Sequence, residues 1–148
     1  MISIEMLKKQ HADILEQVDT ILKAIKGNEV VLNKELVQEL VTKISDELRL
    51  HLLVEDDLLY PALMKDPKES IRNIAYMYVA ELGGIKDTFK KYKAKWTRHE
   101  AIAESIEAFK SETEALITLL KKRIDKENNE LFPLFENRTY RIGSVLTA

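Results

Sequence analysis

The chain has 148 residues, of which 45% are hydrophobic and 32% charged, and this balance predicts one globular domain. Its formal net charge of −2 gives no basis for general binding to nucleic acid or to an anionic membrane surface. It contains no cysteine, which excludes disulfides, thiolate metal ligands and cysteine nucleophiles.

The N-terminus has no basic stretch followed by an apolar segment, so we expect no signal peptide. No apolar run approaches the roughly 18 residues that a membrane-spanning helix needs. We therefore expect a cytoplasmic protein with neither a membrane nor a nucleic acid as its partner.

The sequence predicts four long helices. Apolar residues recur every three or four positions over four stretches, as on one face of an amphipathic helix. Glycine, proline and capping residues mark the ends of these stretches. The breaks are Gly27-Asn28 after the first helix, Asn33 as the cap of the second, Asp66-Pro67 before the third, with Pro67 in its first turn, and Trp96-Thr97 before the fourth.

A glycine pair, Gly83-Gly84, falls inside the third predicted helix. Each glycine in a helix interior costs about 1 kcal/mol relative to alanine, so the pair needs a structural reason. Two interpretations stay open, namely a close helix approach opposite Ala12 and a kink.

Five polar residues interrupt the apolar helix faces. Those faces run from Ile4 to Ile25, Val37 to Leu58, Ile74 to Trp96 and Ile102 to Leu134. The polar residues on them are His11, His51, Glu55, Arg123 and Glu127. A buried charge costs several kcal/mol unless it is paired or bound to a metal, so these positions need an explanation.

An internal repeat contains most of these positions. Residues 51–61 recur as residues 123–133, an offset of 72 (123 − 51). Glu55 matches Glu127, and an aromatic residue followed by proline ends both copies. His51 matches Arg123, however, and a weaker upstream match pairs His11 with Leu82. The second copy has therefore lost the histidines of the first.

Four helices with short connections predict an all-α fold, an antiparallel up-down-up-down four-helix bundle. The repeat makes it two similar αα-hairpins related by a pseudo-twofold axis, which brings both copies of the motif to one level of the core. We expect this bundle to span residues 1–137, followed by a C-terminal tail over residues 138–148.

The surviving polar residues predict a metal site. His51 and Glu55 are four residues apart, so both lie on one helix face. His11 would enter from the adjacent helix, and Glu127 from across the core. Two imidazoles with carboxylates suit iron, manganese or zinc better than calcium or magnesium. The third histidine, His99, lies near a predicted turn and is expected at the surface.

From His11 to Pro133 the chain resembles the hemerythrin-like, or HHE cation-binding, family. The family pattern is a histidine on the first helix, matched by His11, and His-x-x-x-Glu on the second, matched by His51 and Glu55. The resemblance implies a four-helix bundle with a non-heme di-iron centre, and a role in oxygen binding or in sensing oxygen or iron.

The sequence departs from the family pattern at two ligand positions. A Glu-His pair is expected where the chain has Glu81-Leu82, and His-Ile-x-x-Glu where it has Arg123 to Glu127. Leucine offers no ligand atom, and arginine stays protonated with no lone pair to offer. The resemblance therefore implies at most one metal position.

Two functions stay open at this stage. In the first, His11, His51, Glu55 and Glu127 bind one iron or another transition metal, and dioxygen is a possible further ligand. In the second, the core is metal-free, Arg123 bridges Glu55 and Glu127, and the domain is a regulatory or protein-interaction module. In both cases we expect binding rather than catalysis, and the sequence identifies no protein partner.

Overall fold

The computed structural model describes residues 3–27 and 33–135, and within these ranges it contains helices and no strand. The predicted all-α class is confirmed. The elements are α1 (Ile4–Lys26), α3 (Lys34–Val54), the π-helix η1 (Glu55–Leu59), α4 (Tyr60–Leu63), α5 (Glu69–Leu82), α6 (Ile85–Trp96), α7 (Ala101–Glu104), α8 (Ile106–Lys126), the π-helix η2 (Glu127–Leu131) and the 3₁₀ turn η3 (Phe132–Leu134). The predicted tail, residues 138–148, lies outside the described residues.

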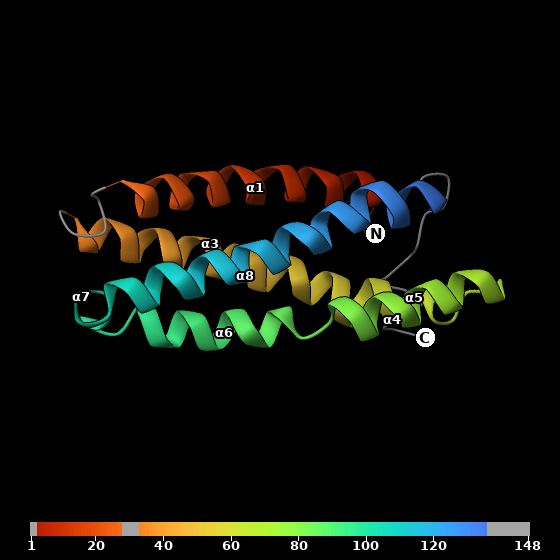
Figure 1. The fold of residues 1–148 in the computed structure, drawn as a ribbon. Coiled ribbons are helices and arrows are strands. Elements are labelled where there is room, and N and C mark those ends of the chain that lie inside the picture. Colours follow the sequence, from red (N-terminus) through yellow and green to blue (C-terminus); the bar gives the residue numbers. More distant parts are fainter. Residues whose placement is uncertain (1–2, 28–32, 136–148) are drawn as a thin grey trace.

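The long helices lie side by side, as Figure 1 shows, and the chain reverses direction from α1 to α3, then to the α5–α6 pair and again to α8. Helix α3 packs against both α1 and α6, and α8 also contacts both of them. The contacts therefore close into a ring around a common interior.

Most helix ends follow the predicted signals. The Asn33 side chain accepts a hydrogen bond from the Leu36 amide, so its capping role is confirmed. Gly27 ends α1, and Trp96 ends α6. The placement of Pro67 in a first helical turn is wrong, because α5 begins only at Glu69.

The third predicted helix is broken in two at the glycine pair. Gly84 has φ +86°, a left-handed conformation that glycine adopts without strain. A Cβ on Gly83 would lie 2.5 Å from the Val79 carbonyl oxygen, so a larger residue would have to displace the backbone. Ala12 is exposed, which does not support the close approach predicted as an alternative. The glycines instead separate α5 from α6.

The two π-helices occupy the same place in the two copies of the repeat. Each begins at a glutamate, Glu55 or Glu127, and each adds a residue to one turn of the helix. The extra residue shifts the buried face, so Leu59 is buried where Leu58 was predicted. The prediction for Leu134 is also wrong, because its side chain is 51% exposed.

A polar layer divides the hydrophobic core into two clusters. On α1, His11 follows Leu7 of one cluster and precedes Ile14 of the other. Glu55 and Glu127 occupy the same intermediate position along their own helices. We call His11, His51, Glu55, Arg123 and Glu127 the polar layer; each of them is at most 3% exposed.

Candidate metal centre

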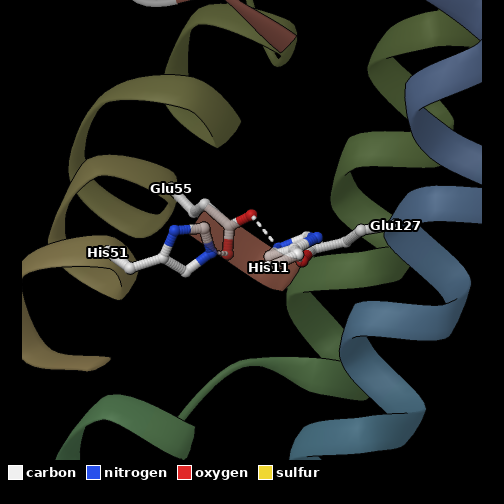
Figure 2. A group of neighbouring side chains, drawn as sticks. All are labelled: His11, His51, Glu55 and Glu127. Atoms are coloured by element: carbon white, nitrogen blue, oxygen red, sulfur yellow. Dashed lines mark ion pairs between the residues drawn. The ribbon is translucent and has the colours of Figure 1, made fainter. Parts of the chain in front are cut away.

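The four predicted ligand residues meet in the polar layer. His11 comes from α1, His51 from the last turn of α3, and Glu55 and Glu127 from the first positions of η1 and η2. Figure 2 shows their side chains pointing toward one another. Each offers one ligand atom, and these atoms all lie within 4.8 Å of one another.

The facing atoms of these four side chains are close but not hydrogen-bonded. His11 Nε2 lies 3.3 Å from Glu55 Oε2 and 3.2 Å from Glu127 Oε1, and His51 Nε2 lies 3.2 Å from Glu55 Oε1. Yet no hydrogen-bond partner exists for His11 Nε2, His51 Nε2, Glu55 Oε2 or Glu127 Oε1 within the described ranges. Each unsatisfied buried polar atom costs about 1–3 kcal/mol.

The opposite nitrogen of each imidazole is well bonded. His11 Nδ1 lies 2.7 Å from Asn128 Oδ1, and His51 Nδ1 lies 2.7 Å from Gln10 Oε1. An amide oxygen only accepts, so Nδ1 carries the proton in both rings. In the neutral ring each Nε2 then presents a lone pair to the centre of the cluster, as a metal-ligating histidine does, and at His11 a metal would displace the proton that the neighbouring carboxylates favour.

Arg123 contacts the same two carboxylates, and it shares Glu55 Oε1 with His51. Its Nη2 lies 3.2 Å from Glu55 Oε1 and 2.6 Å from Asp56 Oδ1, and its Nε lies 3.3 Å from Glu127 Oε2. Its Nη1 donates to the carbonyl oxygen of Leu82, whose side chain is buried, at 3.3 Å. The predicted bridge from Arg123 to Glu55 and Glu127 is thus confirmed.

The structure adds residues that the sequence did not single out for this site. The Tyr60 hydroxyl donates to Glu127 Oε2 at 2.6 Å, and its ring lies beside the Arg123 guanidinium, 5.6 Å from the ring centroid to Cζ. The Phe132 ring stacks on His11. Tyr60 and Phe132 are the aromatic residues that end the two repeat copies, so the repeat was an unused signal for them.

Gln10, Asp56 and Asn128 were also missed. Each is the sequence neighbour of a predicted ligand, but it contacts a residue on a different helix. His99 is exposed, as predicted, with 93% of its side chain accessible.

Comparison with known protein families identifies the family of this chain. Residues 2–135 match the family model described as the hemerythrin HHE cation binding domain. The chain belongs to the hemerythrin family. No curated protein and no solved structure matches it. Among the described residues, no helix has both the length and the apolar character needed to cross a membrane.

The electrostatics of this hemerythrin domain favour a cation in the cluster. Burial by itself lowers the pKa of His11, but the Glu127 and Glu55 carboxylates outweigh it and raise that pKa to about 10. Burial and the charge of Glu55 raise the pKa of Glu127. Burial also acts to raise the pKa of Glu55, yet its contacts with His11 and His51 hold that pKa well below its usual value. The cluster therefore attracts positive charge.

The residues present fit a metal ion. Two imidazole nitrogens and two carboxylate oxygens form a donor set typical of iron, manganese or zinc. The charge also fits, because one guanidinium faces the three carboxylates of Glu55, Asp56 and Glu127. With both histidines neutral, as metal ligands are, two negative charges remain, which is the charge that one divalent cation neutralises.

A small cavity reaches Arg123 in the polar layer. It has a volume of about 200 Å³ and lies at the break between α5 and α6. It is lined by Asp56, Tyr60, Tyr78, Val79, Gly83, Gly84 and Arg123, and by none of the four candidate ligands.

Proposed function

We propose that this hemerythrin domain binds a single transition metal ion, with iron as the family's usual metal, through His11, His51, Glu55 and Glu127. The observation that carries the proposal is the convergence of four buried ligand atoms that have no hydrogen-bond partner among the described residues. A metal bound there would supply a Lewis-acidic centre for a further ligand such as dioxygen.

Arg123 supports one metal rather than two. Its guanidinium contacts Glu127 Oε2, the oxygen that does not face His11, and it shares Glu55 Oε1 with His51. It is positively charged at every physiological pH. Leu82 stands at the other position where the family has a histidine, and it offers no side-chain ligand atom. We infer that Arg123 takes the place of a second metal and leaves a degenerate di-iron site.

The repeat supports the finer architecture that we propose with this function. Matching π-helices start at Glu55 and Glu127, one in each copy. The arrangement proposed is an antiparallel four-helix bundle of two αα-hairpins related by a pseudo-twofold axis, over residues 1–137. The role proposed is oxygen, iron or redox binding or sensing, without catalysis, in the cytoplasm.

A metal-free regulatory or protein-interaction module is the second candidate. The contacts of Arg123 favour it, because the guanidinium already neutralises part of the buried negative charge. It leaves unexplained why both imidazole Nε2 atoms face carboxylates without forming hydrogen bonds.

Elemental analysis of the full chain purified without chelator distinguishes the two. We expect one metal ion per chain, directly or after reconstitution with Fe²⁺, Mn²⁺ or Zn²⁺. Less than about a tenth of an equivalent after reconstitution would rule out the metal-binding proposal and favour the second candidate.

A double variant tests the degenerate-site interpretation. Leu82→His combined with Arg123→His supplies the two missing histidines, and we expect the metal content to rise from one ion to two. If the double variant binds no more metal than the unmodified chain, Arg123 does not occupy a former metal position.

A further inference from the structure

Two amide side chains, Gln10 and Asn128, hold the histidines of the proposed site. We propose that they are positioning residues that fix both imidazoles in the ligating form and, because they are uncharged, favour divalent over trivalent cations at the site. This inference rests on the proposed function, since it concerns which ion the same four ligands accept.

Each of the two amides forms a hydrogen bond with a histidine on a different helix. Gln10 precedes His11 on α1, but its Oε1 accepts from His51 Nδ1 on α3 at 2.7 Å. Asn128 follows Glu127 in η2, but its Oδ1 accepts from His11 Nδ1 on α1 at 2.7 Å. Each amide therefore orients a ligand that belongs to another helix. Rotation of either imidazole would break a short hydrogen bond and turn Nε2 away from the cluster.

Because Gln10 and Asn128 are uncharged, they add no negative charge to the site. Metal-bound histidines are often oriented by a carboxylate, which would add a negative charge beside each ring. Among the described residues, and with both histidines neutral as metal ligands, the charges in contact at the polar layer are those of Arg123, Glu55, Asp56 and Glu127. A divalent ion balances the two remaining negative charges. A trivalent ion would leave one positive charge uncompensated in a buried site, where charge is costly.

Leucine variants test the positioning role. We expect Gln10→Leu and Asn128→Leu to weaken Mn²⁺ and Zn²⁺ binding, measured by chelator competition, by about 10–100-fold. Because both amides are half-buried, we expect the metal-free variants to remain folded by circular dichroism.

Gln17→Leu is the matched control for Gln10→Leu. Gln17 also lies on α1, and its side-chain amide donates a hydrogen bond to Glu47 on α3. This variant therefore removes a hydrogen bond between the same two helices and leaves every candidate ligand in place. We expect its metal affinity to equal that of the unmodified chain. Equal affinities for Gln10→Leu and Gln17→Leu would overturn the positioning role.

Isosteric variants test the charge. Gln10→Glu and Asn128→Asp keep an acceptor for Nδ1 and add a negative charge, so we expect them to bind Zn²⁺ at least as tightly as the unmodified chain. We also expect stronger Ga³⁺ binding and a lower midpoint potential of the iron-loaded protein. Unchanged Ga³⁺ affinity and midpoint potential would overturn the preference for divalent cations.

The outcomes also separate this inference from the proposed function. If the unmodified chain takes up no metal, the proposed function fails, and this inference fails with it. If the unmodified chain binds metal and the Gln10 and Asn128 variants bind it equally well, only this inference fails.

Discussion

The buried carboxylates of the polar layer meet two kinds of partner, the guanidinium of Arg123 and the imidazoles of His11 and His51. We call these the arginine side and the histidine side of the layer. On the arginine side, the guanidinium of Arg123 contacts Glu55, Asp56 and Glu127 and satisfies them. On the histidine side, the Nε2 atoms of His11 and His51 face carboxylate oxygens without hydrogen bonds. Both sides share Glu55 and Glu127, so the difference lies in the partner that each side offers.

In the proposed degenerate site, the second copy of the motif lacks the histidines of the first and keeps the same local fold. Both copies contain the glutamate and the π-helix that begins at it. One hydrophobic cluster lies on each side of this level of the core. Within the polar layer, the two copies differ at the positions of the histidines, where His51 matches Arg123 and His11 matches Leu82. A fixed side-chain charge can replace a cation in holding the core together, but it offers no open position for a ligand.

Arg123→Met breaks the arginine side and should give the largest loss of stability. It leaves three neighbouring carboxylates, two of them fully buried, without their cation, at a cost of about 3–5 kcal/mol. Chemical denaturation of the metal-free protein measures this loss. A decrease below about 1 kcal/mol would mean that the guanidinium does not neutralise the layer.

His51→Ala breaks the histidine side and should abolish metal uptake rather than folding. It removes one of two imidazole donors and leaves every contact of Arg123 in place. The matched control is His99→Ala, which removes an exposed imidazole and should keep full metal content. If His51→Ala retains the metal stoichiometry of the His99→Ala control, His51 is not a ligand.

Tyr60→Phe sharpens the comparison, because Tyr60 bonds the Glu127 oxygen that faces Arg123 and not the one that faces His11. We expect a loss of about 1.5–3 kcal/mol, as for a hydrogen bond to a charged group, with metal stoichiometry retained. Tyr76→Phe, at an exposed tyrosine, controls for loss of a hydroxyl. Loss of the metal in Tyr60→Phe would show that the two sides are not separable.

Gly84→Ala tests the helix break beside the arginine side and should have the smallest effect. Apart from its chain neighbours, no described residue has an atom within 4 Å of an added Cβ, so the cost is that of the left-handed backbone, about 1–2 kcal/mol. Thermal denaturation measures it. An alanine variant as stable as the unmodified chain would contradict the left-handed conformation at this position.

Much of the site could be predicted from the sequence, because the repeat and the helical period align its residues. His11, His51, Glu55 and Glu127 meet as expected, and Arg123 contacts both glutamates. The three-to-four-residue spacing predicted the wrong burial for Leu58 and Leu134. A π-helix adds one residue to a turn and so changes the register, and this extra residue leaves no pattern in a single sequence.

The supporting residues were hidden for a different reason. Gln10, Asp56 and Asn128 act on side chains of other helices, so their partners depend on how the helices pack. At Gly83-Gly84 the two interpretations were a close helix approach and a kink. The structure instead ends one helix and begins another there, with a left-handed backbone at Gly84. Signals in the local sequence therefore located the candidate ligands, whereas the residues that support them depend on tertiary contacts.

Anomalous X-ray scattering from crystals of the full chain loaded with Mn²⁺ or Fe²⁺ tests the central claim most directly. The account predicts one peak in the polar layer, within bonding distance of His11 Nε2, His51 Nε2, Glu55 and Glu127, and none beside Arg123. Two peaks, or a single peak on the arginine side, would contradict it, as would a polar layer without any peak.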